Sequence, residues 1–162
     1  MALAYVARFA TSAGKLSDYL RRKLRERGWE GEAAPDIAAL VGRFVEIGYV
    51  DDATFARAKA QGLLRRGYGA RRIDQALGAA GIAEPLREEA RGNGTERRRA
   101  ALVMARKRRF GPFGKGESVD RALREKQVAA MLRAGHPLDH ARAVVNALSE
   151  EALEEWVDET DD

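Results

Sequence analysis

Apolar residues recur along the chain at every third or fourth position, which is the spacing of one face of an α-helix. Four stretches show the pattern most clearly: Ile37, Leu40, Val41, Phe44 and Ile47; Ala56, Ala60, Leu63 and Leu64; Ile73, Ala76, Leu77 and Ala80; and Leu138, Ala141, Val145, Leu148 and Ala152. No stretch alternates apolar and polar residues as a half-buried strand does. The pattern therefore predicts an all-α protein of about nine short helices.

The predicted helix ends repeat along the sequence. Gly28, Gly81 and Gly135 each follow a helical stretch, at successive offsets of 53 and 54 residues. Glycine is favoured at the left-handed position that ends a helix, and the proline after each of these glycines is favoured in the first turn of the next helix. These repeated breaks predict three copies of a three-helix unit.

We expect the units to span residues 1–50, 51–92 and 93–150, followed by an acidic tail at 151–162. A single unit of this size buries little core by itself, and stacked units share one. The expected architecture is therefore an array of tandem repeats.

The middle unit carries a specific signature. Residues 48–56 read GYVDDATFA, residues 67–73 read GYGARRI, and Leu77 and Gly81 follow at their expected spacing. This combination resembles the RecX family, the bacterial regulators of the RecA recombinase, and the resemblance covers most of residues 2–150. Ser12 is followed by Lys15 where the family usually has a glutamate, so no capping box is expected there.

The resemblance implies an elongated, curved array of three tandem three-helix repeats without catalytic activity. Members of the family bind the RecA filament in its helical groove. They mainly inhibit its ATPase, strand exchange and growth, or promote its disassembly. The resemblance therefore implies a cytoplasmic role in homologous recombination, DNA repair and the SOS response.

The net charge of +4 hides a division along the chain. Residues 150–162 hold eight acids and no base, which leaves residues 1–149 with a charge of +12. A strongly basic body attracts polyanions by releasing their counterions. We therefore expect weak electrostatic binding to single-stranded or duplex DNA, besides the RecA filament.

Basic residues gather at the expected helix ends, where guanidinium groups suit phosphate and carboxylate oxygens alike. We predict a surface for the partner or DNA that consists of Arg65, Arg66, Tyr68, Arg71, Arg72, Arg97, Arg98, Arg106, Lys107, Arg108 and Arg109. For any one arginine, a solvated helix face is the simpler explanation. The recurrence of bases at unit corners favours binding.

Two other functions fit the same residues. Three-helix units with basic second or third helices could act as an independent DNA-binding protein with helix-turn-helix-like units. An adaptor that binds protein alone, with a charge that is only compositional, is the second alternative.

No residues suggest catalysis. Asp51 or Asp52 is expected to cap the helix that begins there, with Phe55 packed inward one turn later. His136 and His140 stand at the spacing of a helical metal half-site, but no third ligand cluster appears, so we expect a helix-start cap and a surface histidine. We expect no enzyme activity, no metal and no cofactor.

The remaining expectations concern location and the tail. The chain has no cysteine, no apolar run near the ~18 residues of a membrane span and no signal peptide, which indicates a cytoplasmic protein without membrane contact. A monomer is expected. The tail either folds back over basic surface or extends the last helix while its acids keep the protein soluble, and a docked Trp156 would favour the first.

Overall fold

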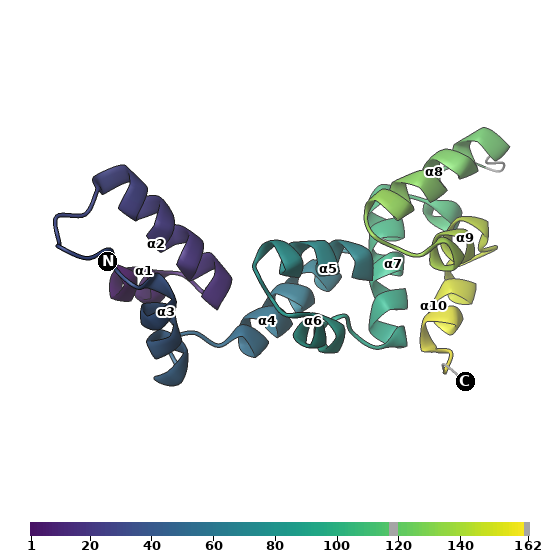
Figure 1. Ribbon diagram of the computed structural model, residues 1–162. Coiled ribbons are helices and arrows are strands. Elements are labelled where there is room, and N and C mark those ends of the chain that lie inside the picture. The colour runs from purple at the N-terminus through teal and green to yellow at the C-terminus, as the bar shows by residue number, and fades with distance from the viewer. Residues whose placement is uncertain (117–119, 161–162) are drawn as a thin grey trace.

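The computed structural model describes residues 1–116 and 120–160, and in these ranges it is all-helical, as the pattern predicted (Figure 1). Its α-helices are α1 (Ala2–Arg8), α2 (Ala13–Arg27), α3 (Ile37–Glu46), α4 (Asp52–Arg65), α5 (Ala70–Ala79), α6 (Glu84–Ala90), α7 (Gly94–Arg108), α8 (Arg121–Arg133), α9 (Leu138–Asn146) and α10 (Glu150–Asp158). A 3-10 helix, η1 (Gly111–Phe113), joins α7 to the segment before α8.

The helices form three groups that follow one another in a row from α1–α3 through α4–α6 to α7–α10, as Figure 1 shows. Each group has its own apolar core. Leu16 and Val41 lie in the first core, Ile73 and Leu77 in the second, and Met131 in the third. The row is therefore a chain of small cores rather than one large core.

Helix ends follow the local chemistry of the sequence. The carboxylate of Asp51 accepts the backbone N–H of Thr54 at 3.1 Å, so the predicted cap of α4 is confirmed. Gly28, Gly81 and Gly135 have φ of 73°, 74° and 95°, the left-handed conformation expected at the ends of α2, α5 and α8. These three turns set the direction in which each unit continues.

The periodicity assigns two apolar residues to buried helix faces, but both are exposed in the structure. Ile47 is 65 % exposed because α3 ends at Glu46, so the residue lies beyond the face that the helix buries. Leu148 is 97 % exposed because α9 ends at Asn146 and a separate helix begins at Glu150. The predicted helical stretch from Leu138 to Ala152 is therefore wrong, since it is two helices.

The first two units meet at the start of α2 and the end of α5. The hydroxyl of Ser12 donates to the carbonyl of Ala80 while accepting the N–H of Lys15. Gly14 packs directly on Gly81, where a Cβ would stand 3.0 Å from the Cα of Gly81. A serine and a pair of glycines thus bring two helix ends together.

The second and third units meet in the same way, at the start of α5 and the end of α8. The N–H of Gly69 donates to the carbonyl of Ala134 at 2.9 Å, and the N–H of Arg71 donates to that of Gly135 at 3.1 Å. In addition, Ala100 of α7 belongs to the core of the middle unit. This junction joins the two units through backbone bonds and shared core.

Candidate partner-binding site

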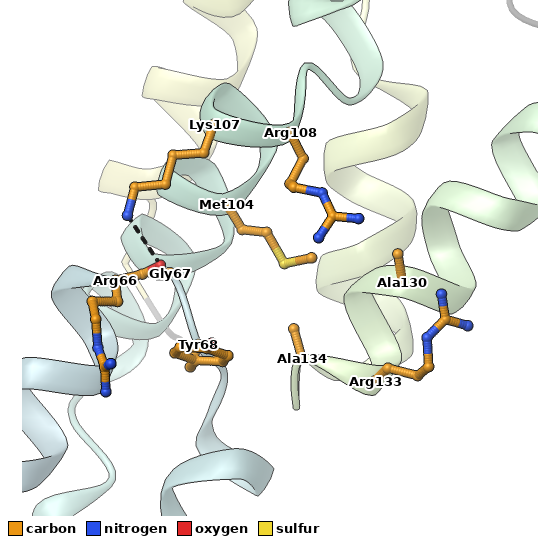
Figure 2. Close-up of a pocket in the computed structure, with 9 residues that line it drawn as sticks. All are labelled: Arg66, Gly67, Tyr68, Met104, Lys107, Arg108, Ala130, Arg133 and Ala134. Carbon is orange, nitrogen blue, oxygen red and sulfur yellow. Dashed lines mark hydrogen bonds between the residues drawn. The ribbon is translucent and has the colours of Figure 1, made fainter.

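A basic pocket of about 290 Å³ lies at the junction of the second and third units (Figure 2). Its lining residues are Arg66, Gly67, Tyr68, Met104, Lys107, Arg108, Ala130, Arg133 and Ala134. They come from the end of α4, the last two turns of α7 and the end of α8. Four of them are cationic and none is acidic, so the pocket has a strongly positive potential.

A close approach of backbones builds one wall. Gly67 has φ of 91°, and a Cβ on it would stand 2.9 Å from the backbone nitrogen of Met104. Because only glycine fits there, the turn after α4 lies directly against α7. This contact places Arg66 and Tyr68 beside Lys107, whose ammonium donates to the carbonyl of Arg66 at 3.3 Å.

Tyr68 organises the arginines around it. The guanidinium carbons of Arg66 and Arg72 lie 5.5 Å and 5.8 Å from the centroid of its ring. The negative face of an aromatic ring attracts cations at such distances. The half-buried ring therefore holds two exposed, flexible side chains near the pocket mouth, which lowers the entropy lost when they bind an anion.

The structure brings part of the predicted surface together. Arg66, Tyr68, Lys107 and Arg108 line the pocket, and Arg72 reaches its edge through Tyr68. Arg65 is exposed in the last turn of α4, and Arg109 lines a neighbouring pocket with Arg108. Arg71 and Arg97 line a third pocket, of about 650 Å³, with His136.

Arg98 does not belong to this surface. The residue is only 6 % exposed, and its Nε donates to the carbonyl of Val157 at 3.2 Å. A second nitrogen donates to the carbonyl of Glu159. The run of charges from Arg97 to Arg99 looks uniformly exposed in the sequence, but one member of three in a helix faces the adjoining helix.

Arg106 is also engaged inside the chain. Its guanidinium donates to Glu154 at 3.0 Å and stands over the ring of Phe113, 5.3 Å from the centroid. Arg99 pairs with Asp158 at 3.2 Å. The acids of α10 thus neutralise the outer face of α7, while Lys107 and Arg108 remain on the pocket side.

The acidic tail is therefore a docked helix as far as the structure describes it. Leu153 and Val157 are buried in the third core, and the Trp156 ring meets that of His140 edge-on at 5.3 Å. Asp161 and Asp162 lie outside the described residues. The helix packs on the third core and covers basic surface, which favours the interpretation that the tail folds back. The interpretation that it extends the last helix is wrong, because α9 ends at Asn146 and α10 begins separately at Glu150.

Five of the nine lining residues were not in the predicted surface, and Arg133 and Met104 are the two with long side chains. Arg133, in the last turn of α8, is an isolated base of the kind that helix dipoles commonly attract. Met104 reads as an ordinary core residue. Only the docking of Gly69 on Gly135 shows that the end of α8 faces the end of α4, and no local pattern encodes that contact.

The interpretation of His136 as a helix-start cap is wrong. Its side chain is 3 % exposed, and its Nε2 lies 2.7 Å from the carbonyl of Gly67, to which it donates. Pro137 takes the cap position of α9 instead. Burial lowers the pKa of His136, so the ring is neutral at pH 7 and serves as a buried link between the units.

Other kinds of site lack support in the described part of the chain. Residues 1–116 and 120–160 contain no group of three or more metal-ligating side chains. Within the same ranges, no helix combines the length and the apolar character of a membrane span.

The row of helical units has counterparts in known proteins. Residues 51–90 match the family model described as RecX, second three-helix domain. The regulatory protein RecX of Myxococcus xanthus is 30 % identical over 154 residues, which cover 90 % of this chain and 82 % of that protein. The regulatory protein RecX of Thermus thermophilus is 40 % identical over 88 residues, or 54 % of this chain and 58 % of that protein.

A solved structure supports the fold. The crystal structure of RecX from Lactobacillus salivarius superposes with a TM-score of 0.68 over 89 % of each chain, at 17 % identity. That likeness concerns the helical architecture, whereas the Myxococcus relative extends the sequence match over nearly the whole chain. This chain belongs to the RecX family of regulatory proteins.

Proposed function

We propose that this protein binds the RecA filament on single-stranded DNA and restrains its ATP hydrolysis, strand exchange and growth. The observation that carries the proposal is the basic pocket between the second and third units, in a member of the RecX family. The planar guanidinium groups of its arginines and the compact ammonium group of Lys107 can donate hydrogen bonds to phosphate or carboxylate oxygens. We place the partner contact there.

The shape of the molecule supports binding along a groove. The three groups of helices form an elongated row (Figure 1), and the pocket opens at one of its junctions. A row of units can follow a helical groove lengthwise and place bases at intervals against a polyanion. Such a protein would block the groove without any chemistry of its own.

The alternative of an independent helix-turn-helix protein is disfavoured by the junctions. A recognition helix reads DNA through residues near its N-terminus. The first N–H groups of α5 instead bond to the end of α8, through Gly69 and Arg71. The backbone at the start of α5 is therefore bonded to the neighbouring unit, which disfavours its entry into a major groove.

The decisive experiment adds this protein to RecA assembled on single-stranded DNA and measures ATP hydrolysis. We expect hydrolysis to fall as the protein approaches one copy per RecA protomer at low salt. Unchanged hydrolysis at stoichiometric protein would contradict the proposed function. Binding to duplex DNA without RecA, with base specificity, would favour the alternative.

A quadruple variant tests the pocket itself. Replacing Arg66, Lys107, Arg108 and Arg133 by alanine should weaken filament binding at least tenfold and flatten its salt dependence, because fewer counterions are released. The matched control replaces four exposed bases elsewhere, namely Arg43, Arg57, Arg121 and Arg142. Equal losses in the two variants would mean that overall charge, rather than the pocket, binds the filament.

A further inference from the structure

The outer end of the first unit carries an apolar pocket of about 390 Å³, at the opposite end of the row from the third unit (Figure 1). It lies between α1, the second half of α2 and the start of α3. Leu20, Leu24 and Leu40 line its floor, and Lys23 and Arg27 are its charged lining residues. No part of the chain that the structure describes fills it.

The repeats show what kind of group belongs in such a place. The residue after the left-handed glycine is Ile82 in the middle unit and His136 in the third, and these are 1 % and 3 % exposed. The corresponding Trp29 of the first unit is 57 % exposed. In the other two units this side chain is buried, Ile82 in the middle core and His136 at the junction with the middle unit.

The turn at Gly28 is also more open than the corresponding turns at Gly81 and Gly135. A Cβ on Gly81 would stand 3.1 Å from the Cα of Gly14, and one on Gly135 would overlap the backbone of Arg72. A Cβ on Gly28 would meet nothing within 4 Å. The two inner turns support the start of another helix, whereas the turn at Gly28 also has a positive φ but an open approach.

Trp29 lines the pocket wall, and its ring is tied to the loop that follows it. The indole N–H donates to the carbonyl of Ala33 at 2.6 Å, in the segment between α2 and α3. Swinging the ring inward would break this bond. The ring therefore stays in the wall, 57 % exposed, and leaves the pocket accessible to an outside group.

The charges around the pocket indicate which kind of segment would carry the side chain that fills it. Besides Lys23 and Arg27, α2 carries Lys15, Arg21, Arg22 and Arg25, against only Asp18 and Glu26. Inside this chain, α10 already packs as an acidic amphipathic helix against basic α7. Its apolar Leu153 and Val157 are buried while Asp158 pairs with Arg99. An acidic amphipathic helix would meet the same combination of apolar and basic residues at the outer pocket.

We propose that the outer pocket of the first unit docks an acidic amphipathic helix of the protein partner, with one aliphatic side chain in the position that Ile82 fills in the middle unit. The proposal rests on the proposed function, since the partner tested is the RecA filament. It assigns the first unit a contact separate from the basic pocket. The protein then touches its partner at two separate places along the row.

The first experiment uses the absence of cysteine from the chain. Leu3→Cys places a thiol on the pocket wall, where Leu3 is 55 % exposed, and Ile47→Cys places a control thiol outside the pocket, where Ile47 is 65 % exposed. Maleimide labelling is timed with and without RecA filament on single-stranded DNA. We expect labelling of Leu3→Cys to slow at least tenfold and that of Ile47→Cys to change less than twofold.

The outcomes separate the two levels of the proposal. If the filament's ATP hydrolysis falls but Leu3→Cys labels at its free rate, the docking site is wrong and the proposed function stands. If hydrolysis does not fall, the proposed function itself is wrong. Protection of Leu3→Cys by added copies of this protein alone would mean that a second copy occupies the pocket, and would also overturn the proposal.

A charge reversal tests the acidic character of the occupant. Lys23→Glu with Arg27→Glu should weaken filament binding about tenfold relative to Arg21→Glu with Arg25→Glu. Both pairs lie on α2, change the charge equally and each break one local ion pair, Lys23 with Glu26 or Arg21 with Asp18. Equal losses for the two pairs would show that the pocket rim does not recognise acids.

Discussion

The two junctions between units use the same helix ends but different bonds. At the first, the side chains of Ser12 and Asp52 make the polar contacts, with Asp52 accepting the N–H of Ala13 at 2.8 Å. At the second, backbone groups of Gly69 and Arg71 bond directly to α8, and the buried His136 adds a third bond. The second junction also has α4 packed on α7.

This difference explains why the second junction should be stiffer than the first, although the units they join are similar. A junction held by two side chains can open when those side chains rotate, whereas one held by backbone bonds and shared core opens only with loss of packing. We therefore expect the second and third units to move as one body. The first unit should detach from them at lower free energy.

The largest expected effect comes from adding a methyl group at each junction. In Gly69→Ala the new Cβ would overlap the carbonyl group of Gly135, and we expect a loss of about 3 kcal/mol in the free energy of unfolding. Gly14→Ala, with a Cβ 2.8 Å from the carbonyl oxygen of Ala80, should cost about 1–2 kcal/mol. Urea unfolding followed by circular dichroism measures both.

The control for these two variants is Gly42→Ala, where a Cβ meets nothing within 4 Å. Alanine is the better helix former in α3, so this variant should gain about 0.5–1 kcal/mol. A loss at Gly69 no larger than that at Gly14 would remove the distinction between the junctions.

Ser12→Ala should loosen the first junction by about 1–2 kcal/mol, because it deletes both the bond to Ala80 and the cap on Lys15. Hydrogen exchange should quicken in residues 1–50 and stay unchanged in residues 51–116. Ser149→Ala removes a comparable cap, on α10, and should leave the first unit unaffected. Faster exchange throughout the middle unit in Ser12→Ala would mean that the two units open together.

Acid should weaken the second junction through His136. Burial lowers its pKa below the ordinary 6.5, with His140 nearby adding to the effect, so the unfolded chain binds the proton more readily than the folded one. Stability is then fully present above about pH 6.5 and falls as the pH drops through the lowered value. Urea midpoints at about pH 7.5 and 5.5 should show the fall, and His136→Gln should reduce it. An equal fall in His136→Gln would assign the acid sensitivity to other groups.

The smallest effect is expected at the exposed margin of the second junction. The amide of Gln61 donates to Glu96 at 3.2 Å across α4 and α7. Gln61→Ala should change the free energy of unfolding by less than about 0.5 kcal/mol, since solvent replaces an exposed bond readily. A loss above about 1 kcal/mol in the same urea titration would place the strength of this junction at its surface.

The sequence predicted local features well because local chemistry determines them. Glycines at 28, 81 and 135 end helices, and Asp51 caps one, since each acts on groups within a few residues. Leu77 and Ile73 are fully buried, as their spacing indicated. Periodicity failed at Ile47 and Leu148 because a helix stopped just before each of them.

The candidate site was predicted only in part because contacts distant in sequence build it. The bases at 66, 107 and 108 lie together as expected, but Arg133 joins them only through the docking of α5 on α8. Arg98 is buried because α10 supplies carbonyl acceptors for its guanidinium. A run of arginines in a sequence does not tell which member will find such acceptors.

The bonds from Arg98 to the end of α10 have a consequence for the order in which the protein folds during synthesis. The first and middle cores consist of residues no later than Ala100, so a ribosome can release them complete while the rest is translated. The third core waits for Leu153 and Val157, and the carbonyl acceptors of Arg98 emerge only with the end of α10. A chain that stops before α10 would therefore leave the ribosome with two complete cores and one that is exposed and incomplete.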